Sequence, residues 1–300
     1  MFELDRKVKL EMKFCDIHMR DPFIVPYEGK YYLYGSRGPE AWGHCTGLDV
    51  YVSDDLENWS EPVEVFTPPV DFWSCKNFWA PEVHIYQGKF YMFVSFVSDT
   101  RKRGTQILIS ESPMGPFVVH SDGPVTPAEW NCLDGTLYLD DKGTPYMIFC
   151  REWTQKPEPD IVGEMYAIEL SEDLKEAVGE PIYLFKADDP AWVNPNKKMF
   201  VTDGPFVYKT QSGKELLLWS SMGPYGYCNV ISYPEKEMIS DKWQHCEELF
   251  FWDDGGHGMI FKTFEDKLMF VCHKPNGTPK ERPVLFEAYE ENDMLYLRKL

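Results

Sequence analysis

Side chains that can exchange protons open five similar stretches of this 300-residue chain. In chain order they are Asp21, Glu82, Asp134, Asp203 and His257. Cleavage of a glycosidic bond needs one carboxylic acid to protonate the leaving oxygen, and one carboxylate to activate water or to attack the anomeric carbon. Carboxylates that converge on one place supply such a pair, because their mutual repulsion raises one pKa toward the value that an acid catalyst requires. The residue types therefore indicate acid–base chemistry on a sugar, provided that the fold brings them together.

A structural role is the alternative for each aspartate taken singly. Asp before Pro or Gly is a common turn former, whose side chain accepts hydrogen bonds from nearby backbone amides. Asp21, Asp134 and Asp203 all precede Pro or Gly, and we expect all three at the same repeat position. Three such residues at one position favour a shared function over three unrelated turns.

Five internal repeats must position these side chains. Each repeat has a polar start with Gly or Pro, a strand-like run, a turn, and a second strand rich in Tyr, Phe, Leu and Met. This pattern predicts one β-hairpin in each repeat. The five copies are residues 21–34, 80–93, 134–149, 203–219 and 257–270.

A third strand follows most hairpins, so each repeat supplies about four short strands, the content of one propeller blade. We therefore predict an all-β fold, a five-bladed β-propeller with about four antiparallel strands per blade, as a single domain over residues 1–300. The first residue of each inner strand lies where the blades converge, so residues far apart in sequence meet there. Residues 8–14 are expected to close the ring by pairing with the last blade, over residues 284–289 and 294–297.

The composition limits the kinds of molecule that this protein can bind and the cellular compartment in which it is expected. Aromatic residues make up 16% of the chain, and they suit strand surfaces and sugar-stacking platforms. A net charge of −19 argues against nucleic acid, whose binding depends on cations that neutralise phosphates. The sequence has no C-x-x-C pair, no signal-peptide run and no apolar stretch of ~20 residues. We expect a reduced, cytoplasmic protein with neither a nucleic-acid partner nor a membrane partner.

Three motifs at the starts of repeats point to a known family. They are Arg20-Asp21-Pro22-Phe23, Phe78-Trp79-Ala80-Pro81-Glu82 and Leu133-Asp134-Gly135-Thr136. Together they resemble glycoside hydrolase family 43, whose members are five-bladed propellers that act on arabinose-, xylose- or galactose-containing glycans. The resemblance implies that Asp21 is the general base and that Asp134 modulates the pKa of the acid and orients it. It also implies an inverting mechanism, in which Asp21 activates water while the acid assists departure from the opposite face.

The motif of the fourth repeat departs from that family. Thr202-Asp203-Gly204-Pro205 aligns with the family's Glu-Gly-Pro, in which Glu is the general acid. Asp is shorter by one methylene, about 1.5 Å of reach. Three explanations stay open: the fourth blade lies closer to the substrate, the activity is weakened, or another carboxylate protonates the leaving group. Glu152, which follows the third hairpin, is the candidate for the last of these.

Other residues are candidates for binding substrate. Aromatic rings before the second and third motifs are expected on loops at the pocket rim, where sugar faces stack on such rings. They are Trp73, Phe78, Trp79 and Trp130. Packing inside or between blades is an equally frequent role for each ring taken singly. Glu82 is a further candidate, and Arg282 is expected to reach sugar hydroxyls, with a solvated surface charge as its alternative.

His257 resembles the family's fifth-blade histidine, which often lies near a calcium ion with mostly water ligands. A hydrogen-bonded structural histidine is the alternative, since calcium prefers oxygen ligands. Both roles stay open, and no cofactor is required for the predicted chemistry.

The sequence thus predicts a glycoside hydrolase that cleaves terminal arabinofuranosyl, xylosyl or galactosyl linkages of oligosaccharides by an inverting acid–base mechanism. One alternative is a glycoside phosphorylase-like propeller, which uses a single Asp acid and inorganic phosphate. Phosphate needs clustered cations, and the arginines near the motifs show no evident grouping. The other alternative is a carbohydrate-binding propeller of weak activity, which the Glu-to-Asp departure permits.

Overall fold

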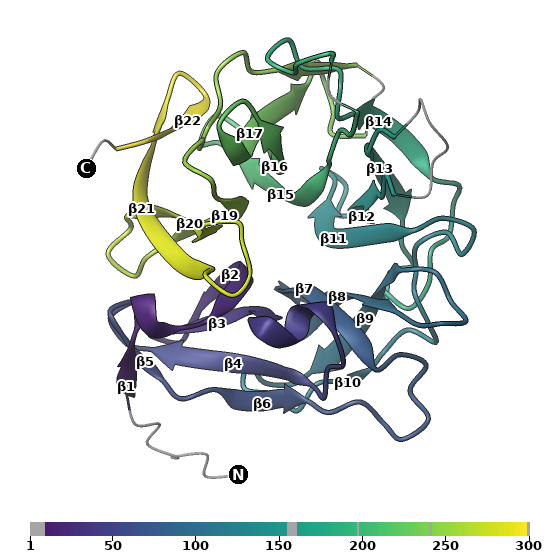
Figure 1. The fold of residues 1–300 in the computed structure, drawn as a ribbon, viewed down its shortest axis with the longest axis vertical. Helices are drawn as coiled ribbons and strands as arrows, with labels where there is room; N and C mark the ends of the chain where they lie inside the picture. Colours follow the sequence, from purple (N-terminus) through teal and green to yellow (C-terminus); the bar gives the residue numbers. More distant parts are fainter. Residues whose placement is uncertain (1–9, 155–160, 197, 240–241, 299–300) are drawn as a thin grey trace.

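The five repeats form five β-hairpins around a central axis (Figure 1). The structure is a computed structural model and describes residues 10–154, 161–196, 198–239 and 242–298. The inner strands face the axis and are β2 (Met19–Tyr27), β7 (Lys76–Tyr86), β11 (Cys132–Leu139), β15 (Asp203–Lys209) and β19 (Gly256–Lys262). Their antiparallel partners are β3 (Lys30–Arg37), β8 (Lys89–Val97), β12 (Pro145–Arg151), β16 (Glu215–Gly223) and β20 (Leu268–Lys274). The predicted all-β, five-bladed propeller is thereby confirmed.

Two-residue turns explain the register of the first two hairpins. Glu28 and Gly29 have φ of 47° and 78°, and Gln87 and Gly88 have φ of 47° and 79°. Positive φ at both central residues defines the type I′ turn, whose twist matches that of the two strands it joins. The repeated Glu/Gln-Gly pair therefore sets how β2 pairs with β3 and how β7 pairs with β8.

Two outer strands complete each blade. The third strands are β4 (Leu48–Ser53), β9 (Gly104–Ser110), β13 (Glu164–Glu169), β17 (Gly226–Pro234) and β21 (Arg282–Glu291). The fourth strands are β5 (Asn58–Ser60), β10 (Val118–Val119), β14 (Ile182–Lys186), β18 (Trp243–His245) and β22 (Met294–Leu297). The first blade also contains β1 (Leu10–Lys13) and β6 (Val63–Phe66).

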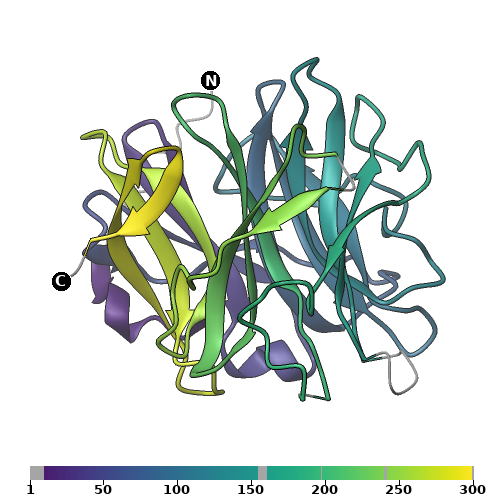
Figure 2. The same ribbon diagram turned by 90° about the horizontal axis from the view of Figure 1, so that it is seen from above.

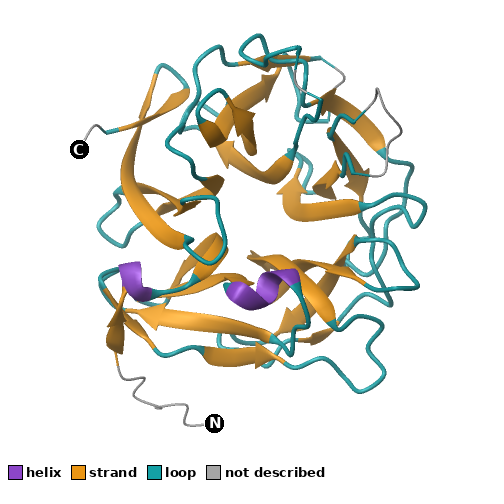
Figure 3. Ribbon diagram, viewed as in Figure 1, coloured by secondary structure: helices purple, strands orange, loops and turns teal. Residues whose placement is uncertain are grey.

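Helices play a small part in the fold. Within the described ranges, helix is limited to the short 3₁₀ elements η1 (Phe14–Asp16) and η2 (Pro39–Trp42) (Figure 3). Neither they nor any other helix in the described part of the chain has the length and apolar character needed to cross a membrane.

The predicted pairing of residues 8–14 with the last blade is wrong. β1 pairs instead with β5 of the first blade, and residues 8 and 9 lie outside the described residues. β21 pairs with β20 on one side and, after a turn at Asn292 and Asp293, with β22 on the other. No open edge is therefore left on β21 for β1 to join.

The first and last blades meet through side chains and inner strands. β2 packs against β19 and β20. The Arg20 guanidinium at the start of β2 donates to Glu281 Oε1 (2.6 Å) and to Asn276 Oδ1 (2.9 Å). These bonds tie the two ends of the ring together at the end of the axis where the inner strands begin.

The core lies between neighbouring blades. Large rings such as Trp59, Phe66 and Phe96 pack in one buried cluster, and Phe185 and Trp219 pack in another. Burying such rings is worth about 25 cal/mol for each Å² of apolar surface removed from water. Figure 2 shows the propeller from the side, with the strands running between its two ends. Close packing between blades fixes where the inner strands begin, and hence the positions of the side chains there.

Candidate active site

A β-bulge interrupts every inner strand at the same place. In β2 the register slips between Arg20 and Phe23, and equivalent slips occur in the other four inner strands. One residue in each bulge has left-handed backbone with φ between 47° and 56°; we call these five residues the axial ring, and they are Asp21, Ala80, Asp134, Gly204 and His257. Residues other than glycine rarely adopt this conformation, and such bulges often re-aim side chains at functional sites.

Two predicted carboxylates stand outside the axial ring. In the fourth blade the ring position is Gly204, so Asp203 precedes it by one residue. In the second blade the ring position is Ala80, two residues before Glu82. The expectation that three aspartates share one repeat position is therefore wrong for Asp203. A Cβ on Gly204 would lie 2.7 Å from the imidazole of His257, so only glycine fits there.

The preceding blade holds each axial-ring residue through its backbone N–H. Four of these N–H groups donate to a side chain at one repeated position: Ala80 to Ser36 Oγ (2.8 Å), Asp134 to Ser95 Oγ (2.9 Å), His257 to Ser220 Oγ (2.7 Å) and Asp21 to His273 Nδ1 (3.1 Å). Cys150 occupies that position in the third blade, and the N–H of Gly204 donates instead to Asp134 Oδ2 (3.0 Å). The Asp134 carboxyl thus joins the third and fourth blades.

Asp21 is a buried carboxylate held from two sides. Its Oδ2 accepts a hydrogen bond from Ser36 Oγ (2.6 Å), and its Oδ1 lies 3.2 Å from His257 Nδ1. Burial raises the pKa of Asp21, but the nearby charges of His257 and Arg20 outweigh burial and hold the pKa at about 2. Asp21 is therefore ionised at neutral pH.

His273 supports Asp21 as a neutral ring, and the sequence reasoning missed it. Burial lowers the pKa of His273 to about 4. Its Nδ1 accepts the backbone N–H of Asp21, so its proton belongs on Nε2, which lies 3.3 Å from Asn276 Oδ1. The repeats contain a signal for this role. His273 occupies, in the fifth blade, the position that Ser36 occupies in the first blade.

The pKa values of Asp134 and Asp203 are both raised. Burial and then the charge of Asp21 raise the pKa of Asp134 well above its ordinary value. Burial and then the charge of Asp134 raise the pKa of Asp203 to about 8. Asp203 Oδ2 accepts a hydrogen bond from the Tyr227 hydroxyl (3.0 Å), a second partner that the sequence reasoning missed. Asp203 keeps part of its surface exposed, whereas Asp21 and Asp134 are buried.

The end of the axis thus combines an ionised carboxylate with a protonated, accessible carboxyl. One can accept a proton and the other can donate one.

The family model for glycosyl hydrolases family 43 matches residues 14–290. This chain belongs to that family.

Individual relatives in family 43 agree with this membership. The chain is 28% identical over 149 residues to the extracellular endo-α-(1→5)-L-arabinanase 1 of Bacillus subtilis (strain 168), a match that covers 45% of this chain and 44% of that protein. It is 25% identical over 257 residues to a xylosidase/arabinosidase of Bacteroides ovatus, covering 72% of this chain and 79% of that protein. The chain is thus aligned with less than half of the Bacillus arabinanase.

Solved structures resemble the whole propeller. An endo-arabinase from Bacteroides thetaiotaomicron VPI-5482 has a TM-score of 0.84 and 36% identity, covering 95% of this chain and 99% of that chain. A family 43 β-1,3-galactosidase has a TM-score of 0.68 and 17% identity, covering 97% of both chains, and supports the fold alone.

Trp79 lies in β7, one residue before the axial-ring residue Ala80, and contacts Trp42, a tryptophan that the sequence did not single out. Trp42, at the end of η2, is 54% exposed, and its ring centroid lies 5.0 Å from that of Trp79 in an edge-to-face arrangement. The Trp79 indole N–H donates to the carbonyl of Ala41. The guanidinium of Arg103 covers Trp79, with its central carbon 3.5 Å from the ring centroid.

Three other predicted rim rings lie elsewhere. Phe78 is 1% exposed and packs against Phe96 in the core, so its predicted contact with substrate is wrong. Trp73 also packs against Phe96, and its indole N–H donates to Gln106 Oε1 (2.6 Å). Trp130 lies between Arg151 (4.3 Å) and Tyr166 (4.8 Å), and the structure gives it no contact with the axial ring.

Arg282 and Glu82 have partners outside the axial ring. Arg282 bonds His18 and the carbonyl oxygens of Pro279 and Glu281, so its predicted reach into the pocket is not what the structure gives. Glu82 is 4% exposed, and its Oε2 lies 3.1 Å from His84 Nε2. Its charge helps to raise the pKa of Asp134 from this buried position.

Glu152 follows β12 and faces Arg103. Its Oε2 is 3.9 Å from Nε of Arg103, and both residues line a cavity of about 400 Å³. Arg101 and Lys102 line the same cavity, so the expectation that cations near the motifs are not grouped is wrong at this place. Burial raises the pKa of Glu152, and the charge of Arg103 opposes that shift.

His257 acts mainly as a partner of Asp21. Its Nδ1 lies 3.2 Å from Asp21 Oδ1 and 3.7 Å from Asp134 Oδ2. Among the described residues, no group of three or more His, Cys, Asp or Glu side chains is arranged to hold a metal ion. The side chains in the described part of the chain therefore do not form a calcium cage by themselves. A calcium ion with mostly water ligands stays a prediction from the resemblance.

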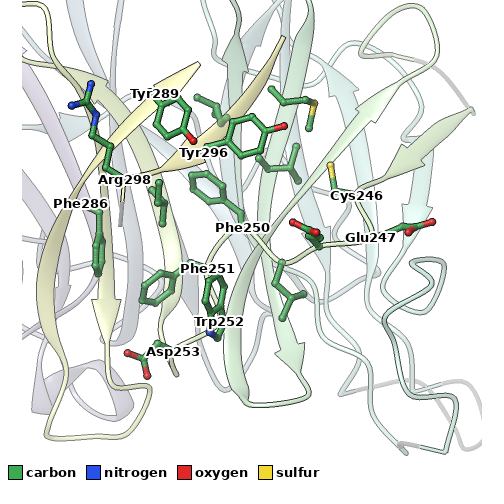
Figure 4. A pocket seen from close by; sticks show the side chains of 16 residues that line it. Cys246, Glu247, Phe250, Phe251, Trp252, Asp253, Phe286, Tyr289, Tyr296 and Arg298 are labelled. Atoms are coloured by element: carbon green, nitrogen blue, oxygen red, sulfur yellow. The ribbon is translucent and has the colours of Figure 1, made fainter. Parts of the chain in front are cut away.

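A larger cavity lies away from the axial ring, between the fourth and fifth blades (Figure 4). Its volume is about 1120 Å³, and its walls include Trp252, Phe286, Tyr289 and Tyr296. Among its described lining residues there is no member of the axial ring. Size alone would therefore select the wrong region as the centre of the chemistry.

Proposed function

We propose that this chain is a glycoside hydrolase that cleaves terminal arabinofuranosyl, xylosyl or galactosyl linkages of oligosaccharides by an inverting acid–base mechanism. One observation carries the proposal: within one cluster the pKa of Asp21 is about 2 and that of Asp203 is about 8. At neutral pH, Asp21 is ionised and Asp203 holds a proton, which is the pair that glycoside hydrolysis needs. The activities for which the relatives above are named support the arabinosyl and xylosyl classes.

In the proposed reaction, Asp203 gives its proton to the glycosidic oxygen as the bond from that oxygen to the anomeric carbon breaks. A water molecule attacks the anomeric carbon from the opposite face and passes a proton to Asp21. Ser36 and His257 hold the Asp21 carboxylate in place for this step. Asp134 helps to keep Asp203 protonated, because its charge raises the pKa of Asp203. The proton then returns from Asp21 to Asp203 through solvent.

The first test is a screen of aryl α-L-arabinofuranosides, β-D-xylosides and β-D-galactosides with the wild type and with Asp21→Ala. We expect the wild type to hydrolyse at least one class, and Asp21→Ala to lose that turnover while its circular dichroism stays unchanged. Absence of turnover on all three classes, with binding of the matching oligosaccharides retained, would favour the carbohydrate-binding alternative.

The second test is the configuration of the first product. Proton NMR at early times is expected to show an inverted anomeric centre, because water attacks from the face opposite the leaving group. A product of retained configuration would contradict the proposed roles of Asp21 and Asp203.

Phosphorolysis remains the second candidate because Arg101, Lys102 and Arg103 line one cavity beside the axial ring. Such a group of cations suits phosphate. Turnover that depends on added phosphate and releases a sugar 1-phosphate would favour this candidate over hydrolysis.

A further inference from the structure

Arg103 is a buried arginine with unused hydrogen-bond donors beside the axial ring. Its side chain is 9% exposed, and its Nε and Nη1 are buried with no hydrogen-bond partner within the described part of the chain. The nearest carboxylate oxygen, Glu152 Oε2, lies 3.9 Å from Nε, which is too far for a hydrogen bond. Because buried polar groups are nearly always satisfied in proteins, we expect these two nitrogen donors to bind an acceptor that is not among the described residues.

Trp79 fixes the direction in which these donors point. The guanidinium stacks at 3.5 Å on the Trp79 ring, which the carbonyl of Ala41 holds through the indole N–H. Stacking uses the flat face of a guanidinium and leaves its in-plane N–H groups for other partners. Glu152 and Asp134 are the two carboxyls close enough for their charges to act on Arg103. Arg103 therefore both lines the side cavity and lies within electrostatic range of Asp134.

A second stacked arginine shows what a purely structural pair looks like in this chain. Arg151 lies 4.3 Å from the ring of Trp130 and donates to Glu164 Oε2 at 3.1 Å. Its stack and its in-plane ion pair are both complete without a ligand. Arg103 has the same stack, but its carboxylate partner stays out of hydrogen-bond range.

The cavity next to Arg103 has the size and polarity of a sugar subsite. Its volume of about 400 Å³ lies within the range of roughly 300–1,000 Å³ that is usual for small-molecule pockets. Besides Arg103 and Glu152, its walls include the polar side chains of Asn131 and Thr154. The cavity lies at the end of the propeller where Asp134 stands, because Cys132 pairs with Arg151 immediately before Glu152.

We propose that Arg103 and Glu152 form a sugar-binding subsite, in which one substrate hydroxyl accepts a hydrogen bond from Arg103 and donates one to Glu152. A hydroxyl both donates and accepts, whereas a guanidinium only donates and an ionised carboxylate only accepts. A phosphate at the same place would meet the carboxylate of Glu152, so a neutral hydroxyl suits this pair better than an anion. The inference rests on the proposed function for the identity of the ligand as a glycan, and it makes Glu152 a binding residue.

The kinetic test compares Arg103→Gln and Arg103→Lys with the matched variant Arg151→Gln. We expect Arg103→Gln to raise KM roughly tenfold and to change kcat less than threefold, the signature of a contact made equally in the ground and transition states. Lys provides charge without the planar fork, so Arg103→Lys should recover only part of the loss. Arg151→Gln should lower the melting temperature and leave KM within about twofold of the wild type.

The binding test uses an Asp21→Asn background, in which turnover is removed. Isothermal titration with α-1,5-arabinotriose and β-1,4-xylotriose measures Kd for this background alone and with Arg103→Gln, Glu152→Gln or both. We expect each added change to weaken binding of one triose roughly tenfold, and the pair to weaken it little further, because both groups hold the same hydroxyl. Independent, fully additive effects would contradict a shared hydroxyl.

The outcomes separate this inference from the proposed function. If Arg103→Gln lowers the melting temperature of an active enzyme but leaves KM and Kd unchanged, Arg103 is structural and the subsite is overturned. If the wild type hydrolyses no substrate but its binding of a triose depends on Arg103, the subsite stands and the proposed function fails. If inorganic phosphate raises the melting temperature of the wild type but not of Arg103→Gln, while neither triose does so, the site binds an anion and the hydroxyl assignment is overturned.

Discussion

Asp203 and Glu152 are two carboxyls at one end of the propeller. The charged neighbour that acts most strongly on Asp203 is acidic, whereas that of Glu152 is basic. Asp203 stands near Asp134, and Glu152 faces Arg103 at 3.9 Å. Burial raises the pKa of both groups, but the strongest neighbouring charge raises the pKa of Asp203 further and lowers that of Glu152. Asp203 therefore keeps its proton up to about pH 8, while Glu152 has a cation that favours its charged form.

The comparison shows that neighbouring charge matters more than side-chain length in choosing the acid. A glutamate would match the residue type of the family's general acid, and Glu152 supplies one. Yet Glu152 lies against Arg103 in a side cavity, whereas the shorter Asp203 lies within the cluster that contains Asp21 and Asp134. We therefore assign proton donation to Asp203 and substrate binding to Glu152.

Loss of the base should have the largest effect. Asp21→Asn keeps the shape of the side chain but removes the charge that accepts a proton from water, so we expect kcat to fall by roughly 10³-fold. The measurement is the initial rate on the best aryl glycoside, with circular dichroism and triose binding as controls for an intact fold. A rate near that of the wild type would show that the axial ring is not the reaction centre.

Exchange of each carboxyl for its amide should separate the two candidates for the acid. Asp203→Asn is expected to lower kcat roughly 10²-fold on an oligosaccharide, and far less on a dinitrophenyl glycoside, whose leaving group needs no proton. Glu152→Gln should raise KM and have similar effects on both substrates. If Glu152→Gln instead produced the dependence on the leaving group, the two assignments would be exchanged.

The pH profile should report the same contrast with a smaller effect. The active form needs Asp203 protonated and Asp21 ionised, so kcat/KM should fall as pH rises through about 8, the pKa of Asp203. The acid limb should lie near pH 2, where Asp21 gains a proton. Each limb should approach a tenfold loss per pH unit, and the alkaline limb should be absent in Asp203→Asn. An alkaline limb that persists unchanged in that variant would assign it to another group.

The repeat pattern was sufficient to predict the fold and the charged part of the axial ring. Asp21, Asp134 and His257 start equivalent strands, so one bulge geometry brings all three to the axis. The motif did not show that Phe78 is a core residue, because Phe78 lies in the register slip between Lys76 and Trp79. In the structure Phe78 is 1% exposed and packs against Phe96.

The rest of the site depends on neighbours that no short motif marks. Tyr227 comes from β17, Trp42 from η2, and Arg103 from the segment just before β9. These residues reach the site because blades pack side by side, so their roles depend on interblade distances. The predicted pairing of β1 with the last blade was wrong for a related reason. Whether β21 has a free edge depends on the turn that leads into β22, and the sequence pattern did not show that pairing.

The aromatic cavity of Figure 4 provides the control with the smallest expected effect. Trp252 is 55% exposed on its wall, so Trp252→Ala removes a large apolar surface without touching the axial ring or Arg103. We expect kcat and KM on a short aryl glycoside to stay within about twofold of the wild type, because no axial-ring residue is among the described residues that line this cavity. A fall in kcat comparable with that of Asp203→Asn, at unchanged melting temperature, would mean that charge at the axis is not what locates catalysis in this propeller.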